Sequence, residues 1–206
     1  MTVIHLDRRE PGLVLEDIMA EFENGRPVIL PTDTLYGIGA PISDHSALRR
    51  IFELKSRPLE LTLPIALGNL KMVDETALVR SWQRSTLGEN LPGPVTFILE
   101  ARENLDPLVV RNGTIAVRVP GHPLFIPLTT LAGPIALTSA NRHGGSEFLN
   151  ASEIDREWAG ELLIIEDDTA LAGKASAVLD ITRELPTVLR EGNLNMDELM
   201  GEKHGG

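Results

Sequence analysis

Residues 28–40 read VILPTDTLYGIGA, a short apolar run followed at once by three side chains that carry hydroxyl or carboxyl groups. The run Val28–Leu30 predicts a buried strand. In open α/β sheets ligands usually lie where strands end, so residues 32–34 are candidates for binding a polar substrate. The same three side chains also suit a capped turn that satisfies its own backbone groups. Pattern alone leaves both interpretations open.

Apolar runs alternate with helical patterns on both sides of this stretch, which indicates an α/β domain. The expected strands are Val28–Leu30, Leu63–Leu67, Val95–Leu99, Ile115–Val119, Pro134–Thr138, Leu162–Ile165, Ala177–Ile181 and Thr187–Arg190. The expected helices are Leu13–Glu23, a segment from Ser43 or Asp44 to before Pro58, Ala77–Leu87, Leu124–Ala132 and Ser152–Trp158. We expect a single domain over residues 1–200 and a flexible tail over 201–206.

The composition narrows the class of protein. With 206 residues and 42% hydrophobic residues the chain can build one core, and the absence of cysteine suits a reducing compartment. No signal peptide or membrane-spanning run is visible, so we expect a cytoplasmic protein that does not bind membranes. The formal net charge of -11 makes tRNA or another nucleic acid a weak candidate partner. The five histidines show no metal-ligand spacing, and we expect no metal site built by protein side chains.

Two segments carry cations at informative places. Lys55 continues the apolar stripe of Ile51 and Phe52, so it is expected to face inward, and Arg57 follows two residues later. Together they could aim two positive charges at one anion. The alternative is a lysine at a helix C-terminus whose ammonium reaches solvent. Arg118 interrupts the apolar run of residues 115–119, and there it needs a carboxylate, a phosphate or solvent.

A third polar segment, Thr138-Ser139-Ala140-Asn141, ends another apolar strand. Its side chains could contact phosphate oxygens, a base or a ribose, or they could cap a following helix. His122, between Pro120 and Pro123, is expected to pack or cap rather than to act as a base.

In their joint order the segments PTDTLYGIGA, KSRP, LPGPVTFIL, TIAVRVPGHP, PIALTSAN, SAVLDI and TVLREG resemble the YrdC-like family of threonylcarbamoyl-AMP synthases. The resemblance runs from about Pro27 to Gly192 and implies a single-domain member. It implies a twisted, mostly parallel open α/β sheet, flanked by helices, with a cationic concave site. The implied reaction is a nucleotidyl transfer: L-threonine, bicarbonate and ATP, with Mg²⁺, give threonylcarbamoyl-AMP and pyrophosphate. A downstream threonylcarbamoyl transferase would then modify adenosine 37 of tRNA.

The resemblance also implies roles for single residues. The family's four-residue KxR and SxN set falls on Lys55, Arg57, Ser139 and Asn141 as catalytic residues. ATP contacts are implied for Arg57, Thr114, Ser139 and Arg190. Threonine contacts are implied for Thr34, Arg118 and Ser176, with Arg118 pairing with the substrate carboxylate.

Three positions depart from the family pattern: Leu61 stands where Asn is frequent, Ala177 where Thr is usual, and residues 145–148 resemble the YciO branch. Two alternatives therefore stay open. One is a YciO-like paralogue with a weak or different nucleotide-dependent activity. The other is an RNA-binding module for tRNA or rRNA.

Overall fold

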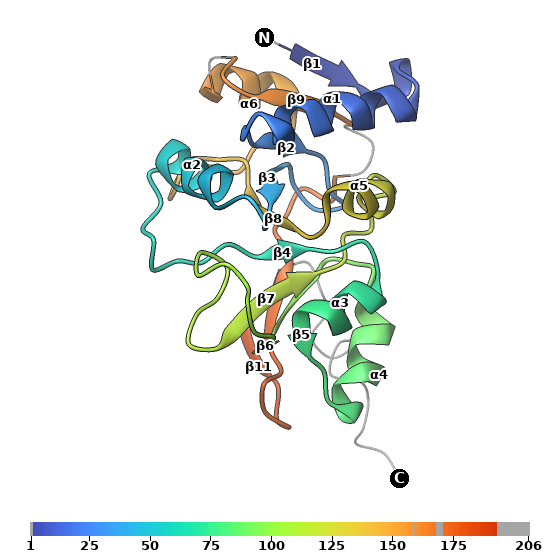
Figure 1. Ribbon diagram of the computed structural model, residues 1–206, viewed down its shortest axis with the longest axis vertical. Coiled ribbons are helices and arrows are strands. Elements are labelled where there is room, and N and C mark those ends of the chain that lie inside the picture. Colours follow the sequence, from blue (N-terminus) through green and yellow to red (C-terminus); the bar gives the residue numbers. More distant parts are fainter. Residues whose placement is uncertain (1, 159, 168–170, 193–206) are drawn as a thin grey trace.

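The computed structural model describes residues 2–158, 160–167 and 171–192, and these form an 11-stranded sheet with helices packed against it (Figure 1). The strands are β1 (Thr2–His5), β2 (Val28–Leu30), β3 (Gly37–Pro41), β4 (Ile65–Ala66), β5 (Ala77–Leu78), β6 (Val95–Ala101), β7 (Thr114–Arg118), β8 (Ile135–Ser139), β9 (Leu163–Glu166), β10 (Ala177–Asp180) and β11 (Thr187–Arg190). The helices are η1 (Leu6–Arg8), α1 (Pro11–Glu23), α2 (His45–Lys55), α3 (Leu70–Thr76), α4 (Ser81–Asn90), α5 (Phe125–Ala132) and α6 (Ala151–Trp158). The tail expected at 201–206 lies outside the described residues.

The sheet is mixed, and the expectation of a mostly parallel sheet is wrong. Its main path runs β1-β9-β2-β3-β8-β4-β7-β6-β10-β11. The pairs β1–β9, β2–β9, β4–β7 and β6–β10 are parallel, whereas β2–β3, β3–β8, β4–β8, β6–β7, β10–β11 and β5–β6 are antiparallel. Three of the antiparallel pairs join strands that follow one another directly in the chain, β2–β3, β6–β7 and β10–β11, and such neighbours pair antiparallel through a short connection.

Alternating side chains of the strands enter two separate cores. Val28 and Leu30 of β2 pack with buried residues of α1 and α5, while Ile29 packs in the core that α2, α3, α4 and α6 share with β6 and β7. This is the period of two that a strand covered on both faces requires. The apolar run Val28–Leu30 is buried on both faces of the sheet for this reason.

The expected helices were confirmed with one exception. Helix α2 begins at His45 after the N-cap Asp44, whose carboxylate accepts from the Ser46 and Ala47 amides, both at 3.0 Å. The helix expected over 77–87 is wrong in its first part. Ala77 and Leu78 form β5 against β6, and α4 starts only at Ser81 because sheet pairing outweighs the helical pattern there.

Strand β3 was not among the strands expected from the sequence. It pairs with both β2 and β8. A Cβ at Gly37 or Gly39 would meet the Leu137 Cδ1 at 2.7 Å or 2.9 Å. The glycines therefore admit the Leu137 side chain of β8, which lines the cavity described next.

Candidate active site

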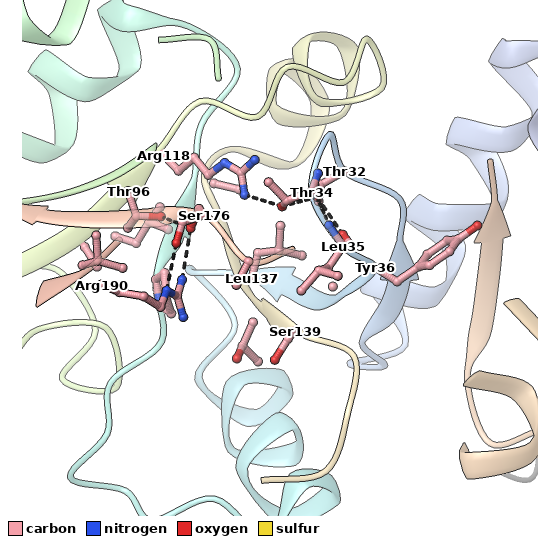
Figure 2. A pocket seen from close by; sticks show the side chains of 18 of the residues that line it. Thr32, Thr34, Leu35, Tyr36, Thr96, Arg118, Leu137, Ser139, Ser176 and Arg190 are labelled. Atoms are coloured by element: carbon pink, nitrogen blue, oxygen red, sulfur yellow. Dashed lines mark hydrogen bonds between the residues drawn. The ribbon is translucent and has the colours of Figure 1, made fainter. Parts of the chain in front are cut away.

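A cavity of about 260 Å³ lies over the middle of the sheet, on the face that α1 and α5 cover elsewhere (Figure 2). In β6, β7 and β10 one set of alternate residues enters the core. The other set faces the cavity, and it includes Thr96, Ala116, Arg118 and Val178. Because no helix of the described residues contributes core side chains over these alternate positions, the strands leave polar groups accessible to a ligand.

The turn after β2 forms one wall of the cavity. The hydroxyl of Thr32 donates to the Leu35 carbonyl at 2.6 Å and accepts from the Thr34 and Leu35 amides at 3.0 and 3.2 Å. Thr34 lies on this wall, with its Oγ1 3.0 Å from that of Thr32. Thr32 thus caps the turn, as the second interpretation of the sequence predicted, while Thr34 lines the cavity.

Arg118 enters from the end of β7 and is held at three points. Its Nε donates to the Gly93 carbonyl at 2.9 Å, Nη1 to the Thr34 hydroxyl at 2.7 Å and Nη2 to the Asp33 carboxylate at 2.6 Å. Of the three partners that the sequence allowed for Arg118, a carboxylate, a phosphate or solvent, the structure shows a carboxylate. Burial lowers the pKa of Arg118, Asp33 raises it, and Arg190 lowers it further. The guanidinium keeps its charge, since an arginine pKa starts above about 12.

Arg190, Ser176 and Thr96 form a second polar group across the cavity from Thr34 (Figure 2). Arg190 donates from Nε to the Ser176 carbonyl at 2.8 Å and from Nη2 to the Ser176 hydroxyl at 3.2 Å. The Ser176 and Thr96 hydroxyl oxygens are 2.9 Å apart. Burial lowers the pKa of Arg190, whereas the nearby Glu147 carboxylate raises it.

Gly192 fixes the position of this group. Its φ is 63°, and a Cβ there would lie 2.3 Å from the Ala177 nitrogen. Only glycine accepts both the conformation and the contact, so the chain after Arg190 lies directly on the backbone beside Ser176.

At the end of α2, the side chains of Lys55 and Arg57 enter different parts of the molecule. Lys55 faces inward, as predicted, with 2% of its surface exposed, and its Nζ donates to the carbonyls of Ser139 (2.5 Å) and Asn141. Burial, and secondarily the charge of Arg57, lower the pKa of Lys55 to about 7. Ser56 between them adopts a left-handed conformation (φ 49°), and Arg57 lines the cavity.

Arg57 is held by backbone rather than by a carboxylate. Its Nε donates to the Leu61 carbonyl at 2.8 Å and its Nη2 to the Thr62 carbonyl at 3.1 Å. Burial lowers its pKa. Neutral carbonyl groups stabilise the guanidinium but leave its net positive charge in place, so it can still attract an anion.

Ser139 and Asn141 end β8 beside these cations. The Ser139 hydroxyl donates to the Asn141 Oδ1 at 2.6 Å, and the Asn141 Nδ2 donates to the Gly145 carbonyl. The helix-capping alternative for this segment is wrong, because turns rather than a helix follow it and α6 starts only at Ala151.

Six of the nine site residues expected from the sequence line this cavity: Thr34, Arg57, Arg118, Ser139, Ser176 and Arg190. Lys55 and Asn141 are not among the lining residues, but both form hydrogen bonds with Ser139. Thr114 is at the far end of β7, four residues from Arg118 and on the same face of the strand, so an extended ligand would have to reach along the sheet to contact it.

Thr96, Glu147 and Asp33 are polar residues of the site to which the sequence assigned no individual role. Thr96 is hidden in an ordinary apolar strand pattern, VTFIL, where one hydroxyl carries no signal. Glu147 lies on a segment without periodicity. The ion pair of Asp33 depends on Arg118, 85 residues away in the chain, which no local pattern encodes.

A second cavity, of about 530 Å³, lies beside α1 and carries two histidine–carboxylate pairs. The His5 Nδ1 is 2.8 Å from the Glu166 carboxylate, and the His122 Nε2 is 3.2 Å from that of Asp167. The His122 Nδ1 accepts from the Leu124 amide, and burial lowers the pKa of this histidine. His122 therefore packs and caps, as predicted.

Over residues 2–158, 160–167 and 171–192, no group of three or more His, Cys, Asp or Glu side chains is arranged to hold a metal ion. In the same part of the chain, none of the helices combines the length and the apolar character needed for crossing a bilayer.

The model of the Sua5/YciO/YrdC family, described as "Telomere recombination", matches residues 20–192. The chain belongs to the Sua5/YciO/YrdC family. The threonylcarbamoyl-AMP synthase of Pyrococcus abyssi is 34% identical over 180 residues, which are 85% of this chain and 53% of that protein. The chain thus spans about half the length of this Sua5/YciO/YrdC relative.

Two solved structures of the family share the fold. The crystal structure of P. abyssi Sua5 complexed with L-threonine matches with a TM-score of 0.89 and 29% identity, covering 98% of this chain and 62% of that one. Escherichia coli YciO matches with a TM-score of 0.84 and 26% identity, covering 96% of this chain and 98% of that one. The α/β fold of the Sua5/YciO/YrdC family, with its mixed sheet and flanking helices, is therefore confirmed for this chain.

Proposed function

We propose that this chain is a threonylcarbamoyl-AMP synthase that acts on L-threonine, bicarbonate and ATP. The observation that carries the proposal is the convergence of Arg57, Arg118 and Arg190 with serine and threonine hydroxyls on one cavity. The relative from P. abyssi is named threonylcarbamoyl-AMP synthase, and a crystal structure of P. abyssi Sua5 was solved in complex with L-threonine. Guanidinium groups suit both the carboxylate of an amino acid and the phosphates of a nucleotide.

Arg118 is the group best prepared for the amino-acid carboxylate. A guanidinium has five N–H donors. The contacts to Gly93, Thr34 and Asp33 use three of them, which leaves two. Because the three contacts fix the plane of the guanidinium, the remaining donors are pre-oriented and lose little entropy when a carboxylate binds. Thr34 and Ser176 would complete the threonine subsite.

Arg57 and Arg190 would face the phosphates. In the proposed reaction the threonine amine takes up bicarbonate as a carbamate and releases water. A carbamate oxygen then attacks the α-phosphorus of ATP, the bond to the β-phosphate oxygen breaks, and pyrophosphate leaves. Enzymes of phosphoryl-group transfer act mainly by positioning the reactants and neutralising charge. The two arginines and the Ser139 hydroxyl would do this, while Lys55 and Asn141 hold the end of β8 in place.

Magnesium would enter as part of the ATP substrate. Among the described residues, Glu147 is the one carboxylate that lines the cavity. A Mg²⁺ ion commonly takes its ligands from phosphate oxygens, water and one or two carboxylates, so this donor set fits an ion carried by the nucleotide. Glu147 is the side chain that would help to hold the ion.

The decisive experiment measures pyrophosphate release from MgATP and bicarbonate with and without L-threonine, together with detection of the adenylate by mass spectrometry. Release that depends on threonine, with threonylcarbamoyl-AMP in the mixture, supports the proposal. Arg57→Ala should reduce the rate at least ~100-fold, since it removes a preorganised charge from the phosphate side. Arg49→Ala, on the exposed face of α2, is the matched control and should keep the wild-type rate.

Glu147 favours a second candidate, a YciO-like activity on a different substrate. This carboxylate lies on the segment whose sequence resembles the YciO branch, and it faces Arg190 closely enough to raise the pKa of the guanidinium. Nucleotide-dependent turnover that ignores threonine would favour this candidate over the synthase.

A further inference from the structure

The hydroxyl groups of Thr96 and Ser176 form a buried pair in the wall of the cavity. Their Oγ atoms are 2.9 Å apart, and the residues expose only 5% and 6% of their surfaces. The Ser176 hydroxyl has a further partner, the Nη2 of Arg190 at 3.2 Å (Figure 2). A side chain that enters the proposed chemistry is thus held by two neighbours, of which Thr96 has no role so far.

The possible proton positions on this group are few. A hydroxyl has one proton and two lone pairs, whereas a guanidinium only donates. Arg190 therefore occupies one lone pair of Ser176. If Thr96 donates as well, both lone pairs are filled, and the single Ser176 proton has to point away from both neighbours, toward the cavity. If Ser176 donates to Thr96 instead, no Ser176 proton is left for a ligand.

A carboxylate group placed at Ser176 decides between these two arrangements. The oxygens of the threonine carboxylate and of the carbamate accept hydrogen bonds and cannot donate them, so such an oxygen needs a donor from Ser176. We propose that Thr96 is a positioning residue that donates to Ser176 and thereby makes Ser176 a hydrogen-bond donor to the amino-acid substrate. This inference rests on the proposed function, because it takes its ligand from there.

The backbone places the two hydroxyls together by register and not by side-chain flexibility. Strand β6 pairs in parallel with β10, with Val95 opposite Ala177, and the Ala177 amide donates to the Pro94 carbonyl at 2.9 Å. Gly192 packs on the other side of this backbone. Thr96 lies opposite Val178, and Ser176, two residues before Val178, lines the same cavity. The register therefore holds the two hydroxyls within hydrogen-bonding distance along a diagonal of the sheet.

The test compares Thr96→Val with Thr96→Ser and wild type by calorimetric titration with L-threonine and, separately, with MgATP. Valine keeps the shape and removes the donor, so the affinity for L-threonine should fall roughly tenfold, as the loss of one hydrogen bond to a charged group implies. The affinity for MgATP should change less than about twofold. Thr96→Ser should restore threonine binding. In steady-state assays KM for threonine should rise while kcat stays the same.

A double-mutant cycle separates positioning from packing. If Thr96 acts through Ser176, Thr96→Val should cause no further loss of threonine affinity in a Ser176→Ala background. Thr130→Val, an exposed threonine on α5, is the matched control and should bind both ligands like wild type.

The outcomes distinguish the two proposals. Wild-type threonine affinity in Thr96→Val would overturn the role of Thr96 and leave the synthase proposal standing. Equal losses for threonine and MgATP, with a lowered Tm in both Thr96 variants, would make Thr96 a purely structural residue. A wild-type protein that neither binds L-threonine nor releases pyrophosphate in its presence would overturn the proposed function, and the inference with it.

Discussion

At the scale of single residues, the site contains one ion pair that is largely buried, between Arg118 and Asp33. The side chains of Arg118 and Asp33 expose only 11% and 19% of their surfaces. Removing one partner of such a pair leaves the other charge desolvated and uncompensated. The pair therefore contributes to folding as well as to the proposed substrate subsite.

Arg118→Ala should abolish threonine-dependent turnover and lower the free energy of unfolding by about 3 kcal/mol, because the Asp33 carboxylate loses its partner. Urea denaturation of the variant and of Arg118→Ala/Asp33→Ala checks this, and the double variant should recover part of the loss. Arg8→Ala is the control: its contact with Asp7 is long (3.8 Å) and exposed, and it should cost less than about 0.5 kcal/mol. Unchanged stability of Arg118→Ala would mean that Asp33 finds solvent or another donor.

Lys55 should make stability depend on pH in a recognisable direction. Its folded pKa of about 7 lies below the ordinary value of 10.5, so between these values the unfolded chain holds a proton that the folded chain lacks. The free energy of unfolding then rises with pH across this window. The destabilisation caused by burying a charged Lys55 is greatest below pH 7. We expect the unfolding free energy of wild type relative to Lys55→Met to increase by on the order of 2 kcal/mol between pH 7 and pH 9.5. A flat difference would show that the Ser139 and Asn141 carbonyls keep the ammonium charged.

At the scale of elements, helix α2 ends in a conformation that its sequence does not favour. Ser56 is in the left-handed region, where glycine is usual after a helix. The turn nonetheless sends Lys55 into the core and Arg57 to the cavity, and strained backbone of this kind is often found at functional sites.

Ser56→Gly should raise the free energy of unfolding by about 0.5–1 kcal/mol through relief of this conformation. If the strain helps to orient Arg57, the KM for ATP should rise at the same time. Asn112→Gly is a matched control, since Asn112 (φ 50°) is exposed and lies outside the lining of the cavity. It should gain less stability, because asparagine tolerates the left-handed region, and it should show no change in KM. Loss of stability in Ser56→Gly would contradict the assignment of strain.

At the scale of the whole molecule, the charge balance argues against nucleic acid as a primary ligand. The three cavity arginines are set in a chain with a formal net charge of -11. In a salt-titrated anisotropy assay we expect tRNA to bind no more tightly than a Kd of about 10⁻⁴ M at physiological salt, with a shallow dependence on salt. Tight binding that weakens steeply with salt would instead support the RNA-binding alternative.

The sequence predicted much of the molecule, and what it missed has physical causes. Residues whose side chains follow a local period, such as Val28–Leu30 and Lys55, were assigned correctly because burial imposes that period. Strand β3 was missed because its glycines serve the packing of Leu137, and β5 because pairing with β6 decides it. The contact between Thr96 and Ser176 spans 80 residues and depends on strand register, which local sequence does not encode.

The position of β10 has a consequence for the nascent chain. The ribosome completes β6 long before residues 177–180, which pair with it in parallel and cover one of its edges. During that interval the backbone groups of residues 95–98 on this edge have no strand to pair with, whereas β5 already pairs with residues 100 and 101. An apolar strand with a partly free edge is prone to join other chains. Synthesis that pauses between residues 101 and 177 should therefore favour aggregation, and the polar cavity can be complete only after Arg190 has been added.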